Sequence, residues 1–166
     1  MRVLGVDPGL RLTGYGCVEG EAMRPRIVEA GVIRLSAPGE GETLSPRLAE
    51  LDDDFRELLE RVRPEMVAVE GLFAHHRHPE TSVKMAHARG VLLLAARRWG
   101  ARIVEIKPAA VKKAMTGSGR ASKAQMQEGV ARVFSLATPP EPPDVADALA
   151  IAVCALSRAG AGVVGA

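Results

Sequence analysis

Two short apolar segments of this chain each run directly into a carboxylate. Residues 2–6 contain the run VLGV and lead to Asp7, and residues 66–69 (MVAV) lead to Glu70. Apolar residues at every position are typical of central strands that helices cover on both faces, as in α/β folds. If the two strands pair as neighbours, their terminal acids meet at one edge of the sheet, where open α/β sheets place ligand sites.

The rest of the chain alternates between strand and helix patterns. We expect further strands at residues 13–18, 27–35 and 102–106, the first two of which extend the strand at 2–6 into an antiparallel meander. Helical spacing of apolar residues predicts helices at 44–62, 80–99, 109–115, 123–134 and 144–158. The order predicts an α/β fold with a five-stranded mixed sheet flanked by helices. We expect one domain over residues 1–158 and a mobile tail at 159–166.

Composition indicates a folded protein but does not by itself identify its function. The chain has 166 residues, 47% of them hydrophobic, and a formal net charge of +2, which does not by itself indicate a nucleic-acid binder. Cys17 and Cys154 lack CxxC spacing, so we expect two buried thiols in a reducing compartment. Asp7 interrupts any signal-peptide pattern, and the apolar run at 148–156 is too short to span a bilayer, so we expect a cytoplasmic protein without membrane partners.

A second pair of acids begins the last predicted helix. Asp144 and Asp147 are three residues apart and would share one helical face. Ordinary explanations exist for some of these acids: Asp7 before Pro-Gly suits a turn, and Asp144 suits the positive end of a helix dipole. Glu70 and Asp147 are explained less well in this way.

If they meet, Asp7, Glu70, Asp144 and Asp147 bring four negative charges together. Such a cluster repels itself unless a cation offsets it. Oxygen ligands without His or Cys select Mg²⁺ or Mn²⁺. Two such ions, about 4 Å apart, would balance the charge and activate water for attack on a phosphodiester. The spacing makes this cluster possible but does not show that the segments meet.

Two further segments have the character of phosphate or base contacts. VKKAMTGSGRASK places Lys112, Arg120 and Lys123 around a glycine-containing turn, where side chains and amides can meet phosphates; an ordinary solvated connection is the alternative. The loop EGLFAHHRH holds Phe73, which can stack on unpaired bases or fold back into the core. Its histidines at 75, 76 and 78, with Arg77, favour a phosphate-contacting loop over a metal site.

Five segments, in order, resemble the RuvC family of Holliday-junction resolvases. They are MRVLGVDPGLRLTGYG, VAVEGLF, MAHARGVLLLA, VKKAMTGSGRASK and DVADALAIA, and they span nearly the whole chain. The resemblance implies a ribonuclease-H-like fold and a homodimer that cuts four-way DNA junctions by paired symmetric nicks. It also implies the RuvA and RuvB branch-migration proteins as partners in recombination and repair.

The resemblance also implies roles for single residues. Asp7, Glu70, Asp144 and Asp147 become the catalytic metal ligands. Phe73 becomes a junction-contacting wedge, and Lys112 and Lys123 become phosphate contacts beside the active site. The loop at residues 75–78 departs from the Asn- and Lys-containing loop expected of the family, so the resemblance does not extend to the preferred cleavage sequence.

The predicted helix at 80–99 has features of a subunit interface. Its small residues permit close helix contact, and three successive leucines at 92–94 exceed what one buried face needs. Packing on the sheet alone is the alternative. A two-fold dimer would supply two matched sites to a nearly two-fold-symmetric junction.

Three other functions fit parts of the pattern. A related nuclease that processes structured RNA would use the same acids, so only the substrate separates it from a junction resolvase. An actin-like kinase or ATPase also carries Asp-Pro-Gly after a strand, but 166 residues are too few for its second nucleotide-binding half. A DNA-binding module without catalysis would not need all four acids.

Overall fold

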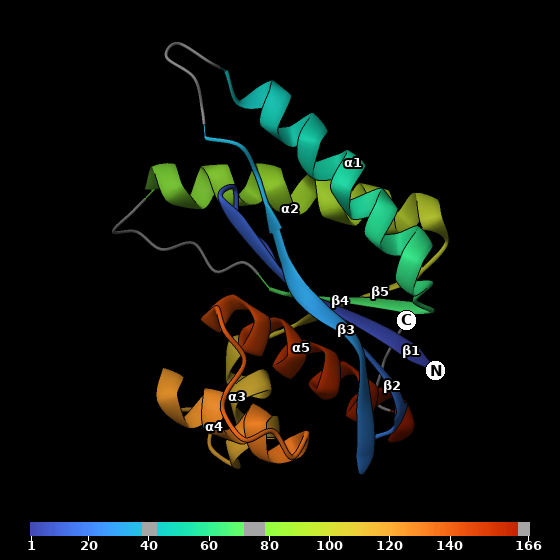
Figure 1. Cartoon of the computed structure of the whole chain (residues 1–166), viewed down its shortest axis with the longest axis vertical. Helices are drawn as coiled ribbons and strands as arrows, with labels where there is room; N and C mark the ends of the chain where they lie inside the picture. Colours follow the sequence, from blue (N-terminus) through green and yellow to red (C-terminus); the bar gives the residue numbers. More distant parts are fainter. Residues whose placement is uncertain (38–42, 72–78, 163–166) are drawn as a thin grey trace.

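The computed structural model describes residues 1–37, 43–71 and 79–162. Its centre is a five-stranded sheet in the order β3-β2-β1-β4-β5 (Figure 1). The strands are β1 (Arg2–Asp7), β2 (Leu12–Glu21), β3 (Arg24–Arg34), β4 (Met66–Glu70) and β5 (Arg102–Ile106). The first three form the predicted antiparallel meander, whereas β4 pairs parallel to both β1 and β5. The predicted mixed α/β sheet is therefore confirmed.

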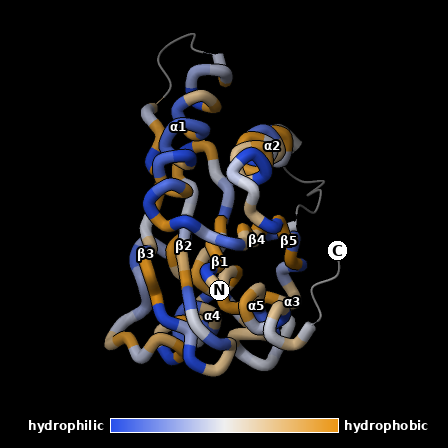
Figure 2. The backbone as a smooth tube through the Cα atoms, turned by 90° about the vertical axis from the view of Figure 1, so that its right-hand side faces the viewer, coloured by the Kyte–Doolittle hydropathy of each residue, from blue (hydrophilic) through white to orange (hydrophobic). Residues whose placement is uncertain are grey.

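Helices cover both faces of this sheet. They are α1 (Leu44–Val62), α2 (Pro79–Trp99), α3 (Pro108–Thr116), α4 (Lys123–Val133) and α5 (Pro143–Gly160). One layer contains α1 and α2, and the other contains α3, α4 and α5 (Figures 1 and 2). The predicted helices agree to within one or two residues at each end; α5 runs to Gly160, two residues beyond its predicted end at Arg158.

Strand alternation divides the core between the two layers. Leu4 and Val6 of β1 belong to the apolar cluster beneath α1 and α2. Val3, together with Met66 and Ala68 of β4, belongs to the cluster beneath α5. Both central strands are thus buried on both faces, as their continuous apolar sequence predicts.

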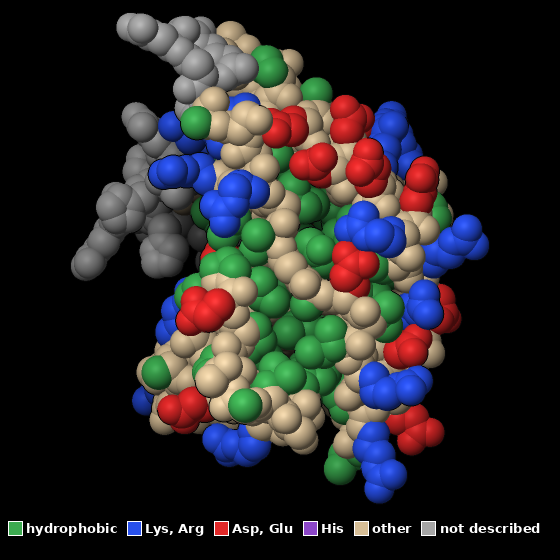
Figure 3. Space-filling view, in the orientation of Figure 1, with side chains coloured by type: hydrophobic (Ala, Val, Ile, Leu, Met, Phe, Trp, Pro, Cys, Tyr) green, Lys and Arg blue, Asp and Glu red, His purple; other side chains and the backbone are tan. Residues whose placement is uncertain are grey.

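The helix α1 shows how the sequence pattern becomes packing. Its apolar stripe, which includes fully buried Phe55, faces the sheet. Charged side chains cover its outward surface (Figure 3). The helix ends at Val62; the capping residue Arg63 adopts the left-handed conformation, and its amide donates to the Leu59 carbonyl oxygen. Pro64 follows, as expected after a helix end.

The helix α5 lies unusually close to the sheet. A Cβ atom added to Gly5 of β1 would collide with the Ala148 carbonyl oxygen, and one added to Gly14 of β2 would collide with that of Asp144. Glycine therefore allows helix backbone to rest directly on strand backbone, which fixes the height of α5 above the sheet.

The cysteines and the apolar character of the helices complete the description of the fold. Cys17 and Cys154 are both free and buried, one in each core cluster. None of the helices in the described parts of the chain combines the length and apolar character that a bilayer span requires.

Candidate active site

The register of the two central parallel strands brings their terminal acids together. Val6 of β1 pairs with Val69 of β4, so Asp7 and Glu70 are the next residue on each strand. Both follow a residue that faces α1 and α2, so both carboxylates project toward the α5 layer. The ends of β1 and β4 therefore place two carboxylates side by side on the same face of the sheet, at one edge of the site.

Local bonds hold both strand ends. The Thr13 hydroxyl, fully buried, donates to the Gly9 carbonyl oxygen over 2.7 Å and accepts from the Gly9 amide over 3.2 Å, which closes the turn after Asp7. After Glu70, the Gly71 amide donates to the Ile106 carbonyl oxygen over 2.9 Å.

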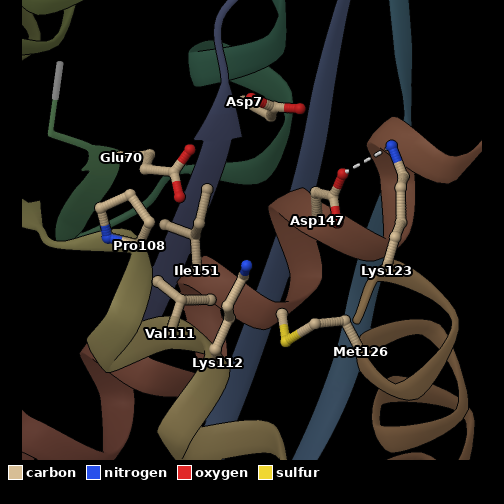
Figure 4. Close-up of a pocket in the computed structure, with 9 residues that line it drawn as sticks. All are labelled: Asp7, Glu70, Pro108, Val111, Lys112, Lys123, Met126, Asp147 and Ile151. Carbon is tan, nitrogen blue, oxygen red and sulfur yellow. Dashed lines mark ion pairs between the residues drawn. The ribbon is translucent and has the colours of Figure 1, made fainter. Parts of the chain in front are cut away.

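A pocket of about 310 Å³ lies between this sheet edge and helices α3, α4 and α5. In Figure 4 the acids of β1, β4 and α5 surround its upper part, and Lys112 and Lys123 approach from α3 and α4. Its lining residues are Asp7, Glu70, Pro108, Val111, Lys112, Lys123, Met126, Asp147 and Ile151. Three of the four predicted acids and both predicted lysines thus converge on one space.

The lysines supply the counter-charge that this space contains. Lys123 Nζ lies 3.3 Å from Asp147 Oδ2, and both side chains are partly exposed. Burial raises the pKa of the Glu70 carboxyl, and the charge of Lys112 partly opposes that rise. Each lysine therefore acts on one of the carboxylates of the pocket, Lys123 on Asp147 and Lys112 on Glu70.

Asp7 and Glu70 nevertheless resist ionisation. Burial is the largest cause that raises the pKa of Asp7 from its ordinary 3.8 to about 7, and the charges of Asp147, Glu70 and Asp144 add to it. Burial also raises the pKa of Glu70, with Asp147 contributing and Lys112 opposing. Buried like charges of this kind favour a bound cation, which would relieve the repulsion.

Asp144 lies differently from the other three acids. Its side chain is not among those that line the pocket, and its main chain packs against Gly14. Its charge still acts on Asp7, as the raised pKa of Asp7 shows. Although Asp144 and Asp147 share one helical face, Asp147 lines the pocket, whereas Asp144 acts on it through its charge.

The donor set fits a hard divalent cation by its chemistry. The described part of the lining offers carboxylates and neither histidine nor cysteine, and oxygen ligands of this kind suit Mg²⁺ or Mn²⁺. Within the described ranges, no three acid, histidine or thiol side chains are close enough to hold one ion together. The carboxylates therefore surround the pocket without forming a closed coordination shell.

The remaining predicted contacts lie elsewhere. Arg120 lines a separate polar cleft between α3 and α4. Phe73, Arg77 and the histidines at 75, 76 and 78 fall outside the described residues. Sequence reasoning missed the apolar floor made by Val111 and Met126. Helical spacing could have indicated Met126, which lies three residues after Lys123, whereas nothing local connects Val111 with the pocket.

The sheet order and the carboxylates at its edge define the ribonuclease-H-like class of nuclease domains. Residues 3–155 match the family model described as crossover junction endodeoxyribonuclease RuvC, and the chain belongs to this family. The RuvC of Moorella thermoacetica is 45% identical over 159 residues, which cover 96% of this chain and 93% of the relative. That of Streptomyces coelicolor is 46% identical over 162 residues, covering 97% of this chain and 84% of the relative.

Solved structures agree with this assignment. Thermus thermophilus RuvC superposes with a TM-score of 0.86 at 35% identity, covering 98% of both chains. The same protein in complex with a Holliday junction substrate gives a TM-score of 0.88 at 34% identity, covering 98% of this chain and 97% of that one.

Proposed function

We propose that this chain resolves four-way (Holliday) DNA junctions by paired symmetric nicks, in recombination and repair. The observation that carries the proposal is the pocket where Asp7, Glu70 and Asp147 meet Lys112 and Lys123. The carboxylates can bind divalent cations, and the lysines can contact the phosphate oxygens of a phosphodiester. Membership of the RuvC family supports a junction as the substrate.

The chemistry follows from the two kinds of side chain. Asp7, Glu70 and Asp147 would hold two Mg²⁺ or Mn²⁺ ions, with Asp144 as a further ligand from the border of the pocket. When bound, such ions activate water and stabilise the charge of an in-line phosphoryl displacement. Lys123 then leaves Asp147 and, with Lys112, neutralises phosphate oxygens of the DNA strand.

A homodimer would place two such pockets on one junction. The helix α2 buries one face, which includes Leu92, in the core, while Val83 and Leu94 on the opposite face are about half exposed. A Cβ atom added to Gly90, between these two, would meet nothing within 4 Å. Val83, Gly90 and Leu94 thus form an exposed stripe along α2. Such a stripe suits close packing against the same helix of a second copy.

The other contacts extend the same proposal away from the pocket. Arg120 would contact a phosphate further along the DNA, and Phe73 and Arg77 would contact the junction beside Glu70. RuvA and RuvB would act with the chain in the cytoplasm.

The direct test is cleavage of a synthetic mobile four-way junction with Mg²⁺ or Mn²⁺. Linear duplex serves as the substrate control and Asp7→Asn as the protein control. We expect paired symmetric nicks from the wild type alone, and junction binding without cleavage by Asp7→Asn. Binding without nicking by the wild type would instead indicate a DNA-binding module, and absence of both would redirect the search to structured RNA.

A further inference from the structure

Arg89 of α2 joins three elements on the far side of the sheet from the pocket. Its Nε atom donates to the main-chain carbonyl oxygen of Glu70 over 3.4 Å. Its Nη2 atom lies 2.7 Å from Oε2 of Glu105 on β5, at ion-pair distance but outside hydrogen-bond geometry. The Arg89 side chain is only 11% exposed, whereas that of Glu105 is 59% exposed. A nearly buried guanidinium therefore connects α2 to the ends of β4 and β5.

Arg89 contacts Glu70 where β4 has left β1 and pairs with β5 alone, through Glu70 and Ile106. Pairing between β1 and β4 ends at Val6 and Val69, one residue before Glu70. Beyond that pair, β5 holds the strand through the bond between the Gly71 amide and the Ile106 carbonyl oxygen. Arg89 adds a further bond to the main chain at this position.

Arg89 and the pocket lie on opposite faces of the sheet, although Arg89 contacts the main chain of Glu70. The Glu70 carboxylate projects toward α5 and lines the pocket, whereas α2 covers the opposite face through residues such as Ala88 and Leu92. Arg89 consequently cannot act as a ligand or a phosphate contact in the pocket. It can act on Glu70 through the main chain alone.

We propose that Arg89 is a positioning residue that fixes the Glu70 carboxylate for cation binding. The inference rests on the proposed function, since it assumes that Glu70 holds a cation. Groups that orient a metal ligand without touching the metal commonly change metal affinity or activity when removed. Here the orienting group holds the ligand's backbone, and Glu105 balances the guanidinium charge.

The choice of arginine has a geometric reason. Its planar guanidinium presents several donors in fixed directions, so one side chain can reach a carbonyl oxygen and a carboxylate at once. A lysine could retain the pair with Glu105, but its single ammonium group is poorly suited to span both acceptors. Arg89→Lys should therefore restore part of what Arg89→Ala loses.

The test compares wild type, Arg89→Ala and Arg89→Lys in three measurements. These are Mn²⁺ binding by calorimetry without DNA, the dependence of junction cleavage on Mg²⁺ concentration, and junction affinity in EDTA. For Arg89→Ala we expect Mn²⁺ binding and cleavage to fall by roughly 10- to 100-fold, with junction affinity unchanged. Added Mg²⁺ should recover part of the lost rate, and Arg89→Lys should lie between the two proteins.

Arg56→Ala is the matched control. Arg56 Nη2 also lies 2.7 Å from a carboxylate, Asp52 Oδ2, but this pair sits on the surface of α1. We expect this variant to bind Mn²⁺ and cleave junctions as the wild type does. Circular dichroism and an unfolding curve would establish that each variant is folded.

The outcomes separate this inference from the function on which it rests. A wild type that binds Mn²⁺ and cleaves junctions, beside an Arg89→Ala protein that is less stable but has the same Mn²⁺ affinity and Mg²⁺ dependence, would overturn the positioning role. A wild type that fails to cleave would refute the proposed function first.

Discussion

The buried acids of the pocket should lower the stability of the metal-free protein. The substitution Asp7→Asn tests this for one of them. The pKa of Asp7 rises from 3.8 to about 7 on folding, mainly because the carboxyl is buried among other acids. An acid whose pKa is raised keeps its full contribution to stability below the unfolded value and loses it as pH rises toward the folded value. The metal-free protein should therefore lose stability between about pH 4 and pH 7.

The size of the effect follows from the same two values. Since one pKa unit corresponds to about 1.4 kcal/mol, ionised Asp7 lowers the free energy of unfolding by roughly 4 kcal/mol at pH 8. At pH 5 Asp7 stays protonated in the folded protein but is largely ionised in the unfolded chain, and the loss of unfolding free energy is then roughly 2 kcal/mol. Asparagine has nearly the same shape and no charge, so Asp7→Asn should recover these amounts.

Urea unfolding followed by circular dichroism measures the difference directly. Both proteins are compared in EDTA at pH 8 and pH 5, at one protein concentration, because association would add its own stability. With saturating Mg²⁺ the wild type should gain more than the variant, since a ligand stabilises the state that binds it. Asp53→Asn, which removes an exposed acid from α1, should change the stability by less than about 0.5 kcal/mol.

The result that would refute this reasoning is specific. If Asp7→Asn in EDTA is no more stable than the wild type at pH 8, ionised Asp7 does not carry the cost that its burial among other acids indicates. A gain that is equal at pH 5 and pH 8 would show that it comes from packing and not from charge.

Three other substitutions test the scaffold and the assembly. Gly5→Ala should cost about 3 kcal/mol in urea unfolding, because its Cβ meets the α5 backbone, which cannot rotate away; an unchanged midpoint would contradict the close contact. Phe55→Ala should cost about 3–5 kcal/mol, since the ring is fully buried beneath α1; a loss under 1 kcal/mol, measured in the same way, would show that the site collapses around the gap. Leu94→Glu should convert a dimer to a monomer in sedimentation without lowering the helix content, because it charges the exposed face of α2; a persistent dimer would place the interface elsewhere.

The sequence could predict the central strands because their signal is local. Continuous apolar residues followed by an acid determine both the burial of β1 and β4 and the place of Asp7 and Glu70 at their ends. The direction in which the two carboxylates point depends on register, the pairing of Val6 with Val69, which no local pattern encodes. A slip by one residue would have sent one acid to the opposite face.

The arrangement of α5 could be predicted only in part. Helical spacing places Asp144 and Asp147 on one face. Which of them enters the pocket depends on how α5 rests on Gly5 and Gly14, two contacts between distant segments that no local pattern encodes. Arg89 escaped prediction for the same reason, since its partners are a carbonyl oxygen and a surface acid on other elements.

The acids of the pocket are held together by the packing of the surrounding elements and not by contacts among themselves. Asp7, Glu70 and Asp147 repel one another, and Lys123 offsets only part of that charge through a partly exposed ion pair. What holds them is the apolar burial of β1 and β4 on both faces, together with the backbone contact of α5. Because the scaffold sustains this repulsion and a cation would relieve it, stability gained by neutralising Asp7 and activity lost by the same change should have one physical origin.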